Sequence, residues 1–210
     1  MNLAVFVGTK GRGSNLMAIH DAITAGRLNA RIVAVVGTDS AAPALERARG
    51  AGLPVRVVPA KGRDAAGYAD ALVDALREAG ADAIALAGYL RILPEAVVDG
   101  WRHRIVNIHP ALLPAFGGKG MYGHHVHEAV IAYGAKVSGC TAHLVDRDYD
   151  TGPVILQRTV AVEDDDTPDI LAARLLPVEH ATFVEALQLL ADGRLKVEGR
   201  RVLVEPRRPN

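Results

Sequence analysis

Five short apolar runs alternate with helical stretches over the first half of the chain, and this alternation restricts the possible folds more than any other feature. The runs are rich in valine, isoleucine and alanine and cover residues 3–7, 32–36, 55–58, 83–87 and 104–108, with helices expected at 16–25, 41–51 and 68–79. A strand that is buried on both faces gives a continuous apolar run, and an intervening helix returns the chain for parallel pairing. The pattern therefore predicts an α/β fold with a mostly parallel sheet and helices on both faces.

The pattern changes after Pro110, but no linker separates the two halves. The elements expected there are a loop at 111–125, a helix at 126–133, strands at 136–145 and 154–162, a helix capped by Thr167 that Pro177 kinks or splits, and a hairpin at 195–204. The 210 residues are enough to bury one sizeable core. We expect a single domain over residues 1–210, in which residues 1–110 form a nucleotide-binding-like half and residues 111–210 a second half that is not independent.

Composition argues against several classes of partner. Lys+Arg and Asp+Glu both number 24, so no net charge favours nucleic acid or an anionic membrane. The single cysteine, Cys140, excludes an internal disulfide and a cysteine-ligated zinc site. His124, His125 and His127 lack supporting acids at ligand spacing, so we expect no metal. The chain starts in a strand pattern without a signal segment or a membrane span, and we expect a cytoplasmic protein.

Two polar residues stand at the end of the fifth apolar run. Asn107 and His109 are separated by one residue, so a strand projects both side chains to the same side. Pro110 then stops ladder hydrogen bonding, which puts the pair at the carboxyl end of the strand, where α/β sheets bind ligands. The pair is either a functional site or a satisfied structural feature.

A glycine-rich turn joins the first run to the first helix. Gly13, Ser14 and Asn15 bring backbone and side-chain donors to the positive end of that helix, which predicts a phosphate site. The turn lacks the Gly-Lys-Ser/Thr of a nucleotide triphosphatase loop. It is also an imperfect dinucleotide fingerprint, because Leu16 replaces the third glycine, although Asp39 stands roughly where a ribose-binding acid belongs. A plain tight turn is the alternative.

Two further segments could border a site. Residues 87–94 follow the fourth run and offer apolar side chains that could line a pocket for a flat ligand, or simply connect a strand to a helix. Asp150 precedes a Thr-Gly-Pro turn and could be held against a histidine, which would raise the pKa of that histidine and orient its ring.

Together, four segments resemble the phosphoribosylglycinamide formyltransferase family of folate-dependent enzymes. The segments are Gly13-Ser14-Asn15-Leu16, Leu86 to Leu93, Asn107-Ile108-His109-Pro110 with Ala111 to Pro114, and Asp150-Thr151-Gly152-Pro153-Val154-Ile155. Their order and spacing cover nearly the whole chain. The resemblance implies the Rossmann-like formyltransferase fold and transfer of a formyl group from 10-formyltetrahydrofolate, as co-substrate, to the amine of glycinamide ribonucleotide in purine biosynthesis.

The resemblance also implies roles for individual residues. Asn107 and His109, the latter as imidazolium, would stabilise the tetrahedral oxyanion, while Asp150 would keep His109 charged and relay the amine proton. The substrate phosphate would lie on Gly13, Ser14 and Asn15, and its ribose against Glu179. The candidate folate contacts are Leu90, Arg91, Ile92, Leu93 and Asn107, with Arg63 and His143 as further candidates.

The chain departs from the family in one loop, and three alternatives stay open. Residues 116–123 are longer and richer in glycine than the family turn, which leaves the roles of that loop and of the histidines after it undefined. A 10-formyltetrahydrofolate hydrolase would use water in place of the amine. A nicotinamide-dependent oxidoreductase would use Gly11, Gly13 and Asp39, and a non-catalytic nucleotide-binding module would leave Asn107 and His109 structural. The oligomeric state is not determined by the sequence.

Overall fold

The computed structural model describes residues 1–206, in two compact units that meet inside one strand. The first unit is Met1–Val106, and the second is Asn107–Asn210. The fifth strand, β5 (Ile105–His109), contains this boundary. The expectation of a single domain over the whole chain stays a prediction.

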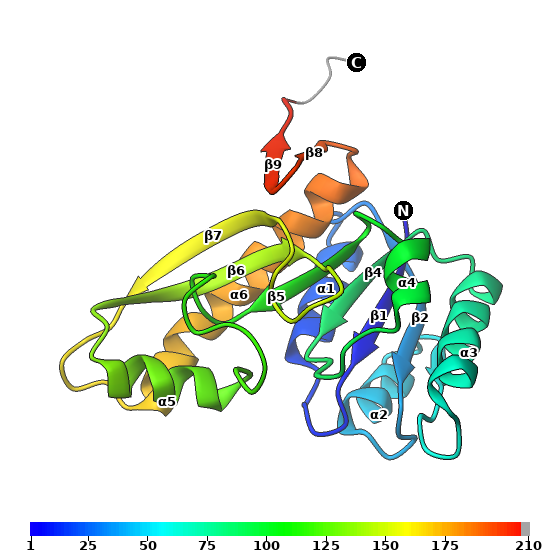
Figure 1. Cartoon of the computed structure of the whole chain (residues 1–210), viewed down its shortest axis with the longest axis horizontal. Helices are drawn as coiled ribbons and strands as arrows, with labels where there is room; N and C mark the ends of the chain where they lie inside the picture. Colours follow the sequence, from blue (N-terminus) through cyan, green and yellow to red (C-terminus); the bar gives the residue numbers. More distant parts are fainter. Residues whose placement is uncertain (207–210) are drawn as a thin grey trace. The chain divides into compact units, whose positions relative to one another are not determined.

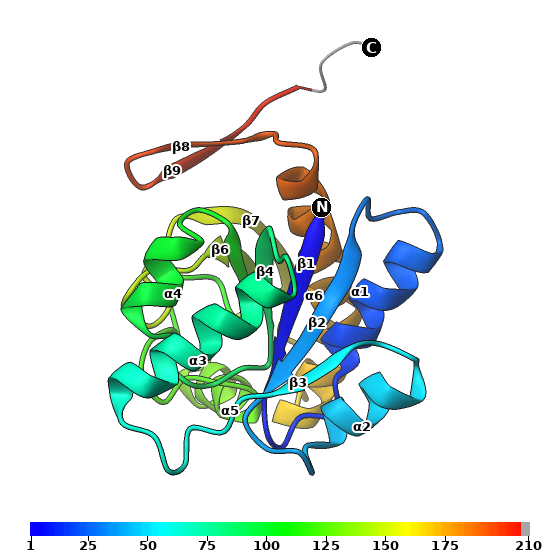
Figure 2. The same ribbon diagram turned by 90° about the vertical axis from the view of Figure 1, so that its right-hand side faces the viewer.

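The first unit is a parallel sheet with helices on both of its faces. Its strands are β1 (Asn2–Val7), β2 (Arg31–Gly37), β3 (Val55–Val57) and β4 (Ala83–Ala87), and its helices are α1 (Ser14–Thr24), α2 (Pro43–Gly50), α3 (Ala65–Glu78) and α4 (Glu95–Gly100). The strand order is β3-β2-β1-β4, and β1 pairs in parallel with both β2 and β4. Figure 2 shows α1 and α2 on one side of these strands and α3 and α4 on the other. The predicted α/β fold is confirmed.

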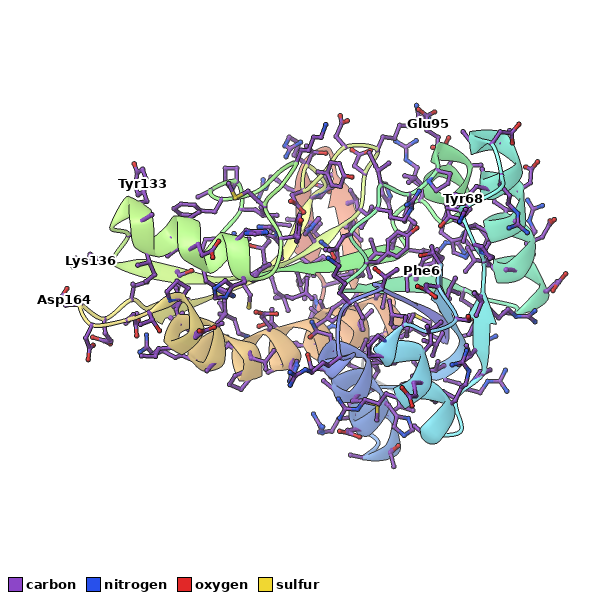
Figure 3. All side chains as sticks on the ribbon, turned by 90° about the horizontal axis from the view of Figure 1, so that it is seen from below. Phe6, Tyr68, Glu95, Tyr133, Lys136 and Asp164 are labelled. Carbon is purple, nitrogen blue, oxygen red and sulfur yellow. The ribbon has the colours of Figure 1, made fainter. Side chains whose placement is uncertain are left out.

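The apolar runs form the core of this unit, as their composition predicts. Leu3, Val5 and Phe6 of β1 are fully buried, and every residue of β4 is buried. Phe6 packs edge-on against Tyr89, whose hydroxyl lies 2.9 Å from that of Tyr68 on α3 (Figure 3). Buried hydroxyls need partners, so this pair satisfies both without opening the core to water.

The second unit is built on an antiparallel pair of strands covered by one long helix. Its elements after β5 are α5 (His124–Tyr133), β6 (Val137–Leu144), β7 (Val154–Ala161), α6 (Pro168–Ala191), β8 (Leu195–Glu198) and β9 (Arg201–Val204). β6 pairs antiparallel with β7, and β8 and β9 form the expected terminal hairpin, which joins β7 through β9. Figure 1 shows α6 running behind β6 and β7. A smaller cluster of Ala111, Val126, Val130 and Leu171 packs α5 against the start of α6.

Most helix ends differ from the expectation by one or two residues, and three further differences concern α3, α4 and α6. α3 begins at Ala65 rather than at residue 68, because the Asp64 side chain accepts a hydrogen bond from the Gly67 amide and caps the helix. The short helix α4 was not expected. Thr167 caps α6 as predicted, and of the two outcomes expected at Pro177, a kink or a split, the split does not occur, because α6 is one helix.

Packing explains why α6 continues through its proline. Buried leucines precede Pro177 and a buried phenylalanine and leucine follow it (Leu171, Leu175, Phe183 and Leu187). The apolar surface that these side chains bury against the sheet offsets the one backbone hydrogen bond that proline removes. Along residues 1–206, no helix is both long enough and apolar enough to cross a membrane.

A close backbone approach in the second unit gives a test of the sheet. A Cβ atom on Gly139 of β6 would lie 2.1 Å from the Arg158 carbonyl oxygen of β7. We expect Gly139→Ala to lower the free energy of unfolding by about 3 kcal/mol, measured by chemical denaturation. Ser138→Ala is the matched control, because the buried Ser138 hydroxyl has no hydrogen-bond partner among the described residues and its removal should cost almost nothing. Equal stability of Gly139→Ala and the control would contradict the close packing of the two strands.

Candidate active site

The polar pair at the end of β5 lies beside a histidine of β6. Asn107 Nδ2 is 3.1 Å from Nε2 of His143, and the Nδ1 atom of His143 donates to the carbonyl oxygen of Leu144 at 2.9 Å. His109 is only 3% exposed, and its Nε2 donates to the carbonyl oxygen of Phe116 at 2.8 Å. The strand periodicity therefore predicts the position of the pair correctly, while its hydrogen-bond partners come from distant segments.

Asp150 completes the cluster. Its carboxylate lies 3.6 Å from His109 Nδ1 through one oxygen and 3.6 Å from His143 Nε2 through the other. The Gly118 amide donates to the same carboxylate at 2.9 Å. The largely buried carboxylate thus lies beside two imidazoles and accepts a hydrogen bond from the Gly118 amide. The structure brings Asn107, His109, His143 and Asp150 together, and their roles stay predictions.

Burial, and not Asp150, dominates the protonation of His109. The loss of hydration lowers the pKa of His109 below its usual value, although the Asp150 charge and the Phe116 carbonyl both act to raise it. At 3.6 Å the carboxylate makes no hydrogen bond to the ring, so its effect is the weaker one. Burial therefore opposes the charge that Asp150 favours on His109, and the expectation that Asp150 keeps this ring charged stays a prediction.

The pKa of Asp150 moves the opposite way from what burial alone would give. Burial is the largest influence and would raise this pKa, but the nearby His143 ring, the charge that His109 can carry and the Gly118 N–H together lower it. Asp150 is accordingly an ionised acceptor at neutral pH. The ionised carboxylate of Asp150 can therefore accept a proton that a reacting group releases beside it.

A buried hydroxyl that the sequence analysis did not single out holds the loop after β5. Thr141 Oγ1 donates to the Ala111 carbonyl oxygen at 2.6 Å and accepts from the Leu113 amide at 3.0 Å. The Gln157 side chain donates to both Thr141 Oγ1 and the Leu113 carbonyl oxygen. The only signal in the sequence is a threonine within an apolar strand, which is too common to point to this role.

The candidate phosphate and folate residues of the first unit lie at the ends of its strands. Gly13 has φ +73° and precedes α1, which Ser14 and Asn15 begin, and the Asn15 Oδ1 atom is buried without a hydrogen-bond partner among residues 1–206. A φ of this sign favours glycine. Asp39 accepts from the Ala41 amide at 3.0 Å, so the acid that a dinucleotide site would need is used locally.

Only some side chains of the candidate folate segment are exposed and so accessible to a ligand. Leu90 and Ile92 are about half exposed, whereas Leu93 is 5% exposed and belongs to the core. The Arg91 guanidinium lies over the Tyr68 ring at 5.7 Å. Arg63 Nη1 donates to the Pro59 carbonyl oxygen at 2.7 Å, so part of its donor capacity serves its own loop.

The remaining candidates lie in the helices of the second unit. Glu179 is a buried residue of α6. On α5, His124 and His125 both face Glu128, whereas His127 is buried, and burial lowers its pKa. Within residues 1–206, no group of three or more histidine, cysteine or acidic side chains is arranged to hold a metal ion. The expectation of a metal-free protein stays a prediction.

Residues 1–187 match the family model described as formyl transferase. The chain belongs to the formyl transferase family. A phosphoribosylglycinamide formyltransferase of Escherichia coli is 36% identical over 94% of this chain and 90% of its own. The crystal structure of glycinamide ribonucleotide transformylase 1 from Symbiobacterium toebii is 37% identical, with a TM-score of 0.89 over 98% of this chain and 95% of that one.

A plant relative is more similar in sequence but longer. The chloroplastic phosphoribosylglycinamide formyltransferase of Arabidopsis thaliana is 45% identical over 92% of this chain. This formyl transferase chain spans 66% of that relative's length, a little under two thirds. The family resemblance inferred from the four sequence segments is therefore confirmed.

The charge of Asp150 should contribute to the pKa of His109 even though burial has the larger effect. We expect Asp150→Asn to lower the pKa of His109 further, because the attraction that favours the imidazolium is removed while burial stays. A titration of the ring resonances of His109 by NMR measures this. Asp148→Asn, an exposed change in the same loop, should leave that pKa where it is. An unchanged pKa in Asp150→Asn would show that the two side chains are not coupled.

The Thr141 hydroxyl should hold the loop after β5. Thr141→Val keeps the shape but leaves the Leu113 amide and the Ala111 carbonyl without this partner, and we expect a loss of about 2 kcal/mol in the free energy of unfolding. Thr159→Val, the same change on the exposed face of β7, should be close to neutral. Denaturant titrations of both variants decide the matter, and equal midpoints would exclude the role given to Thr141.

Proposed function

We propose that this chain transfers a formyl group from 10-formyltetrahydrofolate to the amine of N1-(5-phosphoribosyl)glycinamide, which yields the N-formyl product and tetrahydrofolate in purine biosynthesis. The cluster of Asn107, His109, His143 and Asp150 in a formyl transferase chain is the observation that carries the proposal. The names of the Escherichia coli and Arabidopsis relatives support the choice of acceptor.

The chemistry requires donors near one oxygen and an acceptor for one proton. The amine nitrogen attacks the formyl carbon, and the C=O electrons move onto the oxygen to form a tetrahedral oxyanion. The Asn107 amide is one donor, and the His109 ring becomes the second once Nδ1 is protonated, because its Nε2–H is already donated to the Phe116 carbonyl. Removing one such donor costs roughly a hundredfold or more in rate. The C–N bond to the folate then breaks, and the departing nitrogen takes the proton that the amine gives up.

Asp150 and His109 handle that proton in turn. The resting His109 is neutral because of its burial, but a developing oxyanion adds a second negative charge beside it and favours the imidazolium. Asp150, which is ionised at rest, stabilises the imidazolium that forms when Nδ1 of His109 takes the amine proton, and relays that same proton towards the leaving nitrogen. His109 is thus charged during the reaction and not before it.

We assign the substrate-binding roles from separate observations. The N-terminus of α1 and the unpartnered Asn15 Oδ1 favour a phosphate at Gly13, Ser14 and Asn15. The exposed Leu90 and Ile92 support a folate ring along that segment. The further contacts that we propose are Arg63, Arg91, Leu93, Asn107 and His143 for the folate and Glu179 for the ribose.

We place the reaction in the cytoplasm, with small molecules and no metal, nucleic acid or membrane as partners. The balance of 24 basic and 24 acidic residues supports this choice, because it provides no overall field for a polyanion. The Arabidopsis relative carries the word chloroplastic in its name, so cell fractionation is the appropriate check of location.

The decisive assay follows tetrahydrofolate production with and without the amine substrate. We expect product only when both substrates are present, and we expect His109→Ala to lower kcat by about a thousandfold. His20→Ala on α1 is the control and should keep the wild-type rate. A folded His109→Ala variant with full activity would contradict the mechanism. Formate release without the amine would indicate the hydrolase, and a wild-type chain without any transfer would exclude the proposed function.

A further inference from the structure

The ring of His143 is fixed in one tautomer by its own strand. Its Nδ1 atom lies 2.9 Å from the carbonyl oxygen of Leu144, which can only accept a hydrogen bond, so Nδ1 carries a proton. When the ring carries a single N–H, that N–H is the one at Nδ1, and Nε2 then has a lone pair. The residue is 2% exposed, so water does not compete for either nitrogen.

That lone pair determines which end of the Asn107 amide faces His143. Nε2 is 3.1 Å from Asn107 Nδ2, which has two N–H groups, and an acceptor there selects the amide nitrogen over the amide oxygen. Asp150 Oδ1 lies 3.6 Å from the same Nε2, outside hydrogen-bond distance, so it does not replace Asn107 as a partner. One N–H of Asn107 is used in this contact, and the other is left for another acceptor.

We propose that His143 is a positioning residue for formyl transfer, which holds the Asn107 amide so that its second N–H is presented to the oxyanion. The proposal rests on the proposed function of Asn107, and it gives His143 a different role from that of a folate contact. An oxyanion donor has to lie about 2.7–3.1 Å from the position that the oxyanion will occupy. With the other tautomer of His143, the amide oxygen would face the ring and the donor would move to the opposite side of Cγ.

A double-mutant cycle separates positioning from mere packing. We expect His143→Leu to lower kcat about thirtyfold, as the loss of a residue that orients a reacting group does, with KM for both substrates changed less than about twofold. In an Asn107→Ala background the same change should cost less than about twofold, because the amide that it orients is gone. If His143→Leu acted only through a structural defect, its fold-loss in kcat would be the same in the Asn107→Ala background, and the two losses would multiply.

A conservative variant and a control variant distinguish a loss of positioning from misfolding. His143→Gln offers a carbonyl oxygen as an acceptor and should restore kcat to within about threefold of wild type. His180→Leu is the matched control, since it also deletes a ring of the same unit, one whose Nε2 has no hydrogen-bond partner in the described part of the chain. We expect this variant to keep the wild-type kcat. Failure of His143→Gln to restore the rate, or a full cost of His143→Leu in the Asn107→Ala background, would overturn the proposal.

A readout without turnover tests the contact itself. In 15N NMR spectra, His143 should show a protonated Nδ1 and an unprotonated Nε2, with a coupling across the hydrogen bond to the Asn107 side-chain nitrogen. A protonated Nε2 would overturn the proposal whatever the kinetics show. A wild-type chain that transfers no formyl group would exclude the proposed function and with it any positioning for that reaction, while the spectra would still decide whether His143 holds the amide.

Discussion

The buried carboxylate of Asp150 is the constraint that the second unit has to satisfy. A charge removed from water costs several kcal/mol unless polar groups surround it. Here the groups are His109 at the end of β5, His143 at the end of β6 and the Gly118 amide in the loop after β5. Of these three groups, the Gly118 amide donates a hydrogen bond to the carboxylate, and the two rings lie 3.6 Å from it. The loop of Asp150, the two strand ends and the loop at Gly118 are therefore coupled through one side chain.

Two strained residues show how closely this arrangement is specified. Phe116 and Asp150 both have positive φ values, 52° and 56°, which cost roughly 1 kcal/mol or more for residues with a side chain. The carbonyl of Phe116 accepts from His109, and the carboxylate of Asp150 faces the same ring. The strain is thus located on both partners of His109, and Thr141 and Gln157 hold the loop that carries the first of them.

The regular elements could be predicted because their causes are local in sequence. Continuous apolar runs predict β1, β2 and β4, and Thr167 with Pro168 predicts the start of α6, since caps and periodicity depend on near neighbours. The errors have non-local or subtle causes. Pro177 does not split α6 because packing against β6 and β7 outweighs a local preference. The burial that lowers the pKa of His109 depends on the whole unit, so no local pattern indicated it.

By itself, the sequence determined the α/β fold, the family and the candidate residues Asn107, His109 and Asp150, because residue order and spacing along strands carry that information. Only the tertiary structure decided that Asp150 faces two imidazoles, that His143 faces the Asn107 amide and that Thr141 holds the loop between them. It also decided that burial lowers the pKa of His109. Hydrogen-bond partners and desolvation arise between segments that are distant in the chain, and no local pattern specifies them.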